Sequence, residues 1–318
     1  MESIKVAYTY WFRQGSPVAL GVFRAIMAGL IAINFCMISL FFQDWFSEKG
    51  YTPAWLSAYF LDNNVALTQN GKLNLTRVDL LYGITDYRIL LAFNVIVITL
   101  AIMVSLGLFT RITSILLAIG VVTFHHRNSA ILHGGDTVMR MCALYIAIAP
   151  SGAAFSLDRY FAVKAGKAPP VPPEISMWPQ RLIAYNCSLL YFTTTWAKWF
   201  GVLWKSGAAT WYPARLHEFD RFPVPGFFNQ FPMVYVTTYG TLAVEFAMAT
   251  LVWFKPLRKW VLLSGILLHG YIEYSMNIPL FSYLMISMYI TYYEGDEVVG
   301  WWERVKARFG KKPSLEAA

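Results

Sequence analysis

Apolar residues in this chain form long runs that polar residues interrupt at intervals. The first run extends from Val18 to Phe42, with Arg24 as its charged residue. A helix needs roughly 20 apolar residues to cross the hydrocarbon core of a bilayer, so a run of this kind predicts a membrane-spanning helix. The run is also longer than the apolar core of a signal peptide, and we expect it to be retained.

The same criterion predicts about eight membrane-spanning helices along the chain. They cover Val18–Phe42, Ile89–Phe109, Ile112–Asn128, His133–Ala149, Leu182–Leu203, Val234–Phe254, Trp260–Met276 and Ile278–Tyr293. The third, fourth and eighth runs are short, and a re-entrant segment among them would change the count. The pattern as a whole predicts an all-α integral membrane protein.

Composition supports a membrane protein. Hydrophobic residues make up 57% of the 318 residues and charged residues 14%, whereas about a quarter of the residues in a soluble domain are charged. Aromatic residues reach 17%, and Trp and Tyr are enriched at membrane interfaces. The net charge of +8 fits basic cytoplasmic loops, and we expect no nucleic-acid partner. The cysteines and histidines show no ligand spacing, so we also expect no metal site.

Basic residues are concentrated in alternate loops, which orients the chain by the positive-inside rule. One set of loops includes Lys5, Arg13, the segment from Arg159 to Arg181, and the C-terminal tail. The other set is longer yet carries fewer basic residues, so we expect both termini in the cytoplasm. The expected organisation is a single domain of 1–318, made of a first helix set (1–163), a proline-rich cytoplasmic linker (164–179), a second helix set (180–293) and a cytoplasmic tail (294–318).

Ionisable residues inside the apolar runs are costly in lipid, so each is a candidate for function. Lys198 stands in YFTTTWAKWFGVLWKSG, among tryptophans and phenylalanines. Desolvation can leave a lysine amine neutral and basic at neutral pH, and Thr194 and Thr195, about one turn earlier, can hydrogen-bond to it. Lys198 also lies roughly 7–8 Å from the end of its run, within reach of a snorkelling side chain. Lys198 can therefore be either a general base or a lysine whose side chain snorkels to the membrane interface.

The segment ILHGGDTVMRM places His133, Asp136 and Arg140 on one helical face, at spacings of three and four. We expect Asp136 to cap the N-terminus of this helix and to form a structural ion pair with Arg140. His133 is then either a structural neighbour whose hydrogen bonds this pair satisfies or a functional side chain.

Two further carboxylates lie in apolar runs. Glu273 follows His269 by one turn. Its carboxylate can orient the imidazole and raise its basicity, or the two side chains can only satisfy each other's hydrogen bonds in a packed bundle. Glu245 has no local partner, so it should be protonated or paired with a cation from another helix. Arg24 is one possible partner, although its side chain can instead snorkel.

Five blocks in order along the chain carry a resemblance to a known family. They are VFRAIMAGL, RNSAILHGGD with SLDRY downstream, YFTTTWAKWFGVLWKSG, LAVEFAMATLVWF and LLHGYIEYSMNIPLFSYLMIS. The chain resembles the horizontally transferred transmembrane domain (HTTM) family, whose best-characterised members are the vitamin K-dependent gamma-carboxylases.

In those carboxylases, a lysine in the third of these blocks deprotonates reduced vitamin K, which reacts with oxygen to give an epoxide. Lys198 matches that lysine, and Trp204 aligns with the block's tryptophan across a one-residue gap. A histidine near the start of the fourth helix assists carboxylation. His133 is the nearest match, but the Asn-His-Ser context is absent, which argues against carboxylation of glutamate here. The expected substrate and cofactor pocket includes His269, Asn277, Trp204, Thr194, Glu245 and Glu273.

The resemblance implies a quinol-dependent oxygenase of the epoxidase type, with Lys198 and His133 as catalytic residues. Its cofactors would be a reduced naphthoquinone (vitamin K or menaquinol type) and molecular oxygen. Its partners would be membrane lipid, the quinone, and an exported peptide substrate or a partner subunit.

Short members of the family look like bacterial proteins that mature a secreted sporulation-delaying peptide toxin. They imply a multi-pass protein of the bacterial inner membrane. Its site would face the outer side, where the expected topology also places His133, Lys198 and His269. A non-catalytic maturation or scaffold protein for a secreted peptide toxin is the alternative function, and a transporter is the least supported.

Overall fold

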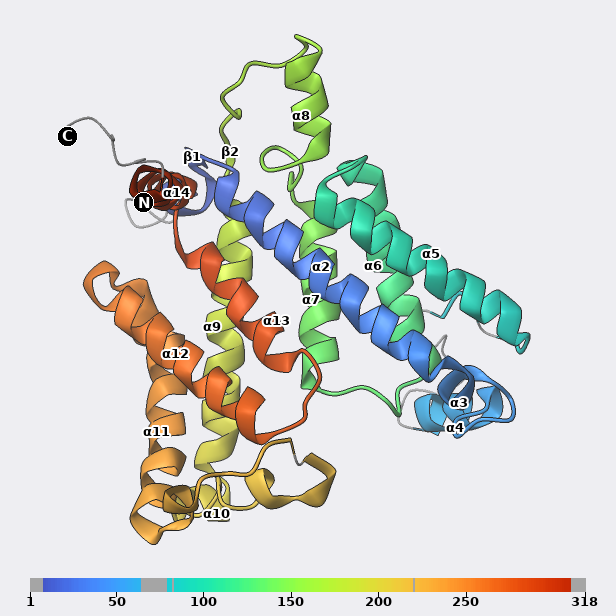
Figure 1. The fold of residues 1–318 in the computed structure, drawn as a ribbon, viewed down its shortest axis with the longest axis vertical. Helices are drawn as coiled ribbons and strands as arrows, with labels where there is room; N and C mark the ends of the chain where they lie inside the picture. The colour runs from blue at the N-terminus through green and yellow to red at the C-terminus, as the bar shows by residue number, and fades with distance from the viewer. Residues whose placement is uncertain (1–7, 64–78, 82, 220, 310–318) are drawn as a thin grey trace, which may run out of the picture.

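The fold is a bundle of long helices, seen in a computed structural model that describes residues 8–63, 79–81, 83–219 and 221–309 (Figure 1). The first half contributes α2 (Val18–Leu40), α5 (Tyr87–Leu106), α6 (Thr110–Arg127) and α7 (Gly134–Ile148). The second half contributes α9 (Trp178–Trp199), α11 (Phe231–Thr250), α12 (Lys255–Ser275) and α13 (Phe281–Ser287), the last continued by the 3-10 helix η6 (Met288–Tyr292).

Shorter elements join and flank the bundle. The helices are α3 (Phe42–Phe46), α4 (Ala54–Asn63), α8 (Leu157–Lys164), α10 (Val202–Lys205) and α14 (Gly295–Phe309), with 3-10 turns η2 (Pro213–Arg215), η3 (His217–Phe219), η4 (Gly226–Asn229) and η5 (Leu251–Trp253). A two-stranded antiparallel sheet pairs β1 (Gln14–Gly15) with β2 (Ile175–Ser176). This sheet is a small departure from the all-α prediction, and it attaches the end of the proline-rich linker to the N-terminal segment.

Seven of the eight predicted apolar runs coincide with a long helix, and the last coincides with the short helix α13 and the 3-10 helix η6. Two described helices, α2 and α5, are long and apolar enough to cross a membrane by length and composition. The 15 residues of α7 span only about 22 Å at 1.5 Å per residue, which is shorter than a hydrocarbon core of ~30 Å. Eight crossings, and the side on which each terminus lies, stay predictions.

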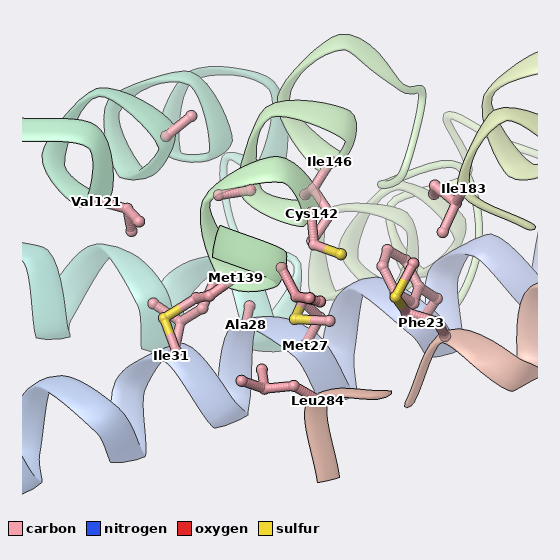
Figure 2. Close-up of a cluster of buried hydrophobic side chains, with 14 of the residues drawn as sticks. Phe23, Met27, Ala28, Ile31, Val121, Met139, Cys142, Ile146, Ile183 and Leu284 are labelled. Carbon is pink, nitrogen blue, oxygen red and sulfur yellow. The ribbon is translucent and has the colours of Figure 1, made fainter. Parts of the chain in front are cut away.

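The apolar core forms around α2, which contacts α5, α7, α13 and η6. Figure 2 shows Met27, Ala28 and Ile31 of α2 beside Met139 and Cys142 of α7. Residues at spacings of three and four lie on one face of a helix, so α2 can present a continuous apolar stripe to several neighbours. Because α13 and η6 pack on α2, the two predicted helix sets share one core.

Arg24 joins α2 to the end of α5 and does not contact Glu245. Its buried guanidinium donates to the carbonyl oxygens of Val104, Ser105 and Phe155. The last carbonyls of a helix have no partner within that helix and carry partial negative charge, so a cation is stabilised there. The structure therefore rules out the Arg24–Glu245 pair that the sequence left open.

The SLDRY segment fixes the start of α6. The carboxylate of Asp158 accepts hydrogen bonds from the backbone N–H groups of Phe109 and Thr110, each at 2.7 Å. Gly107 ends α5 with a φ of 72° and leaves no room for a Cβ against Ser156. This turn therefore depends on one residue that adopts a left-handed conformation and on one carboxylate that satisfies the first N–H groups of α6.

Candidate functional site

Lys198 lies in the last turn of α9, where a cation interacts favourably with the helix dipole. Pro179 occupies the first turn of this helix, where a missing N–H costs no hydrogen bond. The ammonium of Lys198 forms an ion pair and hydrogen bond with the Oε1 atom of Glu245 on α11. The Lys198 side chain is 26% exposed and that of Glu245 only 9%, so the pair lies at the edge of the protein interior.

Trp204 and two threonines surround this ion pair. The Lys198 ammonium lies 5.1 Å from the centroid of a Trp204 ring, a cation–π distance. The hydroxyl oxygens of Thr194 and Thr195 are each 3.4 Å from Glu245 Oε2, but they are 3.0 and 2.8 Å from the Tyr191 carbonyl oxygen. Each hydroxyl has a single proton, so the shorter bond to the carbonyl leaves Glu245 with Lys198 as its principal partner.

A buried chain of polar side chains adjoins the pair through Tyr191. Its hydroxyl lies 2.7 Å from His269 Nε2 of α12 and 2.6 Å from the Tyr289 hydroxyl of η6. His269 also interacts electrostatically with Lys198, while its Nδ1 atom has no hydrogen-bond partner among the described residues. The structure thus brings together four sequence-predicted side chains, Thr194, Trp204, Glu245 and His269, around Lys198.

Glu273 and Asn277 do not join this cluster. Glu273 forms an ion pair with Arg221 in the loop before α11. Asn277 is exposed, and its backbone N–H donates to the Phe219 carbonyl oxygen at 2.7 Å. The predicted His269–Glu273 contact is therefore wrong: His269 points into the bundle, and a cation from a neighbouring loop is a stronger partner for Glu273 than a neutral imidazole.

Asp136 caps the start of α7 as predicted, together with His133, but the predicted ion pair is not formed. His133 Nδ1 accepts from the Gly135 N–H at 2.9 Å, and Asp136 Oδ2 accepts from the His133 N–H at 2.8 Å. Within the described chain, no ion pair joins Asp136 to Arg140. The Asp136 carboxylate accepts the N–H of the residue that precedes α7, which has no partner within the helix, so the carboxylate does not reach Arg140 in the next turn.

His133 lines a cavity to which the Lys198–Glu245 pair does not contribute. A cavity of about 370 Å³ lies between α2, α3, α6 and the start of α7, and its walls include Asn34, His125, His133 and Asp136. Neither Lys198 nor Glu245 belongs to it. His133 stood out in the sequence and His125 did not, because the adjacent histidines in FHHRN show no ligand spacing. Their position before the HGGD segment was the available signal.

A family model described as the HTTM domain matches residues 12–296. The chain belongs to the HTTM family. Neither the curated proteins nor the solved structures that were searched include a significant match to it. The HTTM match contains both the Lys198 cluster and the cavity lined by His133, and together with the two apolar helices α2 and α5 it indicates a membrane protein.

In this HTTM protein an apolar groove adjoins the Lys198–Glu245 pair. It has a volume of about 490 Å³ and lies between α9 and α11. Its walls are Phe192, Trp196 and Trp199 of α9 and Tyr239, Leu242 and Phe246 of α11. Thr195 also lines the groove and contacts Glu245, so it connects the apolar space with the ion pair. Among the described residues, no cluster of three or more side chains is suited to hold a metal ion.

Proposed function

We propose that this HTTM protein is a membrane enzyme that deprotonates a reduced naphthoquinone at the Lys198–Glu245 pair and oxygenates it, in epoxidase-type chemistry like that of the vitamin K-dependent gamma-carboxylases. The oxygenated quinone species would then drive the modification of an exported peptide or another substrate. The observation that carries the proposal is a partly buried lysine–carboxylate pair that Thr195 connects to an aromatic groove.

The ion pair supplies a site that can accept one proton. A lysine and a glutamate in contact have no net charge, whether the shared proton lies on nitrogen or on oxygen. A hydroxyl of the substrate can give its proton to the pair, which then carries one positive charge next to the resulting anion. Trp204 can stabilise this positive charge through the face of its ring. Lys198 and Glu245 are thus proposed to act together, and not as a single neutral amine.

The groove fits a flat aromatic ring with an apolar tail. Its volume of about 490 Å³ falls in the range of pockets that bind small molecules, roughly 300–1,000 Å³. Aromatic side chains on both walls offer stacking partners, and Thr195 leads from the groove to Glu245. When bound there, the reduced quinone would react with molecular oxygen to give an epoxide, and the second oxygen atom would leave as water with the two protons of the quinol hydroxyls.

His133 has no proton-transfer role in this proposal. Its Nδ1 accepts the Gly135 N–H, so in the neutral ring the proton is on Nε2. That tautomer leaves His133 without a free acceptor nitrogen. This assignment agrees with the absence of the Asn-His-Ser context and with the expectation that the protein does not carboxylate glutamate.

The arrangement of helix ends supports a site on the outer side of a bacterial inner membrane. The helices α8 and α14 and the β1–β2 sheet lie at one end of the bundle, while α10, which follows α9, lies at the other (Figure 1). With the basic loops in the cytoplasm, Lys198 faces outward. We therefore propose a multi-pass protein with eight crossings and both termini in the cytoplasm.

The test is the formation of a naphthoquinone epoxide in air by the purified protein in nanodiscs, followed by mass spectrometry. We expect epoxide from the wild type and from Lys205→Ala, because Lys205 is an exposed lysine on α10 outside the cluster. Lys198→Ala should form none while retaining its helical content. Equal epoxide from Lys198→Ala and wild type would contradict the proposal, as would no epoxide from well-folded wild type.

A non-catalytic maturation or scaffold protein for a secreted peptide toxin is the second candidate. The loop between α10 and α11 exposes aromatic side chains, including Tyr212, Phe222 and Phe227, at the same end as α10. This surface would bind a peptide, and no reaction at Lys198 would be required. The scaffold function predicts a peptide or protein cross-linked to this loop in membranes and full maturation with Lys198→Met, whereas loss of maturation in that variant favours the enzyme.

A further inference from the structure

The cavity between α2, α3, α6 and α7 has an apolar body and one polar end. Its apolar walls include Met37, Phe41 and Trp45, and its polar lining residues are Asn34, His125, His133 and Asp136. At about 370 Å³ it is large enough for an alkyl chain or a few apolar side chains. It shares no lining residue with the groove beside Lys198, so chemistry at Lys198 does not explain its polar end.

His125 is the least explained group in this cavity. Its side chain is 3% exposed, and neither ring nitrogen has a hydrogen-bond partner among the described residues. The ring stacks on Phe35, with an interplanar angle of 5° and centroids 6.4 Å apart, which helps to hold its orientation. Buried polar atoms without partners are costly, so an imidazole in this state indicates a missing ligand or solvent contact.

Asp136 presents a second acceptor next to His125. Its Oδ1 atom is 3.8 Å from His125 Nε2, too far for a direct hydrogen bond but suited to one bridging donor between them. Its Oδ2 atom is occupied by the His133 N–H. Asn34 also lines the cavity, and its amide N–H donates to Met139 Sδ at 3.8 Å. Its side-chain carbonyl oxygen is a third acceptor of the lining.

The charge of the cavity selects among polar ligands. Asp136 is the lining residue that can carry a formal charge: burial opposes its ionised form, whereas its place at the N-terminus of α7 and a bound cation favour it. Arg140 interacts electrostatically with Asp136 but does not line the cavity. A carboxylic acid would be repelled by Asp136, whereas an ammonium group would find opposite charge and several acceptors.

We propose that this cavity binds an apolar molecule that ends in a protonated amine. The ammonium group donates to Asp136 Oδ1, to the free lone pair of His125 and to the Asn34 carbonyl oxygen, while the apolar body packs against α2 and α3. An alkylamine and the N-terminus of an apolar peptide present the same chemistry, and the test separates them.

Photolabelling of the full chain in nanodiscs tests this proposal. The probe is dodecylamine with a diazirine on its alkyl chain, and labelled segments are located by peptide mass spectrometry. We expect labels within 37–46 and 131–133, which line the cavity. Unlabelled dodecylamine should compete, and dodecanol and dodecanoic acid should not. An alanine–leucine peptide with a free N-terminus should also compete, unlike its acetylated form, if the cavity accepts peptide ends.

Matched variants separate binding at the polar end from general partitioning. Asp136→Asn keeps a side-chain oxygen for the cap of α7 but removes the charge, and we expect about tenfold weaker protection by dodecylamine, as for loss of a charge-assisted hydrogen bond. His125→Phe should weaken it in the same direction. Asp44→Asn, an exposed carboxylate on the nearby α3, should leave it unchanged.

Two results would overturn the proposal. One is competition by dodecanol or dodecanoic acid that equals competition by dodecylamine in the wild type. The other is unchanged labelling in Asp136→Asn and His125→Phe. The comparison of competitors uses only the wild-type protein, so it decides the question even if a variant does not fold. Competition by dodecylamine without competition by the peptide would identify an alkylamine as the source of the amine, and competition by both would show that the cavity also accepts a peptide N-terminus.

Discussion

Removing one partner of the Lys198–Glu245 pair should destabilise the protein more than removing both. In Lys198→Met, the Glu245 carboxylate, 9% exposed, would keep only two threonine hydroxyls whose protons are directed at the Tyr191 carbonyl. Breaking a buried pair costs about 3–5 kcal/mol. We expect the lower end, about 3 kcal/mol, because an isolated buried carboxylate can take up a proton.

The opposite substitution should be milder. In Glu245→Gln, Lys198 keeps its partial exposure of 26% and the face of Trp204, which contributes about 0.5–2 kcal/mol. The glutamine carbonyl can still accept a hydrogen bond from the ammonium. We expect a loss of about 1–2 kcal/mol, close to that of one hydrogen bond to a charged group.

The assay is reversible unfolding of purified protein in mixed micelles, followed by tryptophan fluorescence, for both single variants and Lys198→Met with Glu245→Leu. We expect the double variant to recover most of the stability lost in Lys198→Met, since a buried pair and an apolar pair of similar volume are often equally stable. A double variant that is less stable than Lys198→Met would refute the coupling, and so would a Lys198→Met variant as stable as the wild type.

Three other substitutions test the structural elements. Arg24→Met should lose about 3 kcal/mol of stability in the same assay, because charged hydrogen bonds to three carbonyls disappear; the exposed Arg88→Met on α5 is the control and should change little. Asp158→Ala should lose about 1–2 kcal/mol, as expected for a helix cap, and an unchanged midpoint would contradict this role. Ile31→Ala should cost about 2–5 kcal/mol by opening a cavity, whereas Ile33→Ala, at a position 50% exposed, should cost less than about 0.5 kcal/mol.

Contacts between helices explain which sequence-based expectations failed. Spacing along one helix predicted the pairs Asp136–Arg140 and His269–Glu273, which can approach because they lie one turn apart. In the structure Asp136 binds the exposed N–H of a helix start, and Glu273 binds a cation from a loop. Neighbouring elements and helix ends therefore supply stronger partners than the next turn of the same helix.

The sequence by itself determined the helices of this protein and the identity of its costly polar residues. Long apolar runs must satisfy their backbone groups internally, so each run folds as a helix whatever its neighbours. Lys198 and Glu245 stood out because charge is rare in such runs. Only the tertiary structure decided that these two form a pair, since they are 47 positions apart on different helices. It also decided that Arg24 binds carbonyls and that His125 lines a cavity, because partners across helices depend on how the helices pack and rotate.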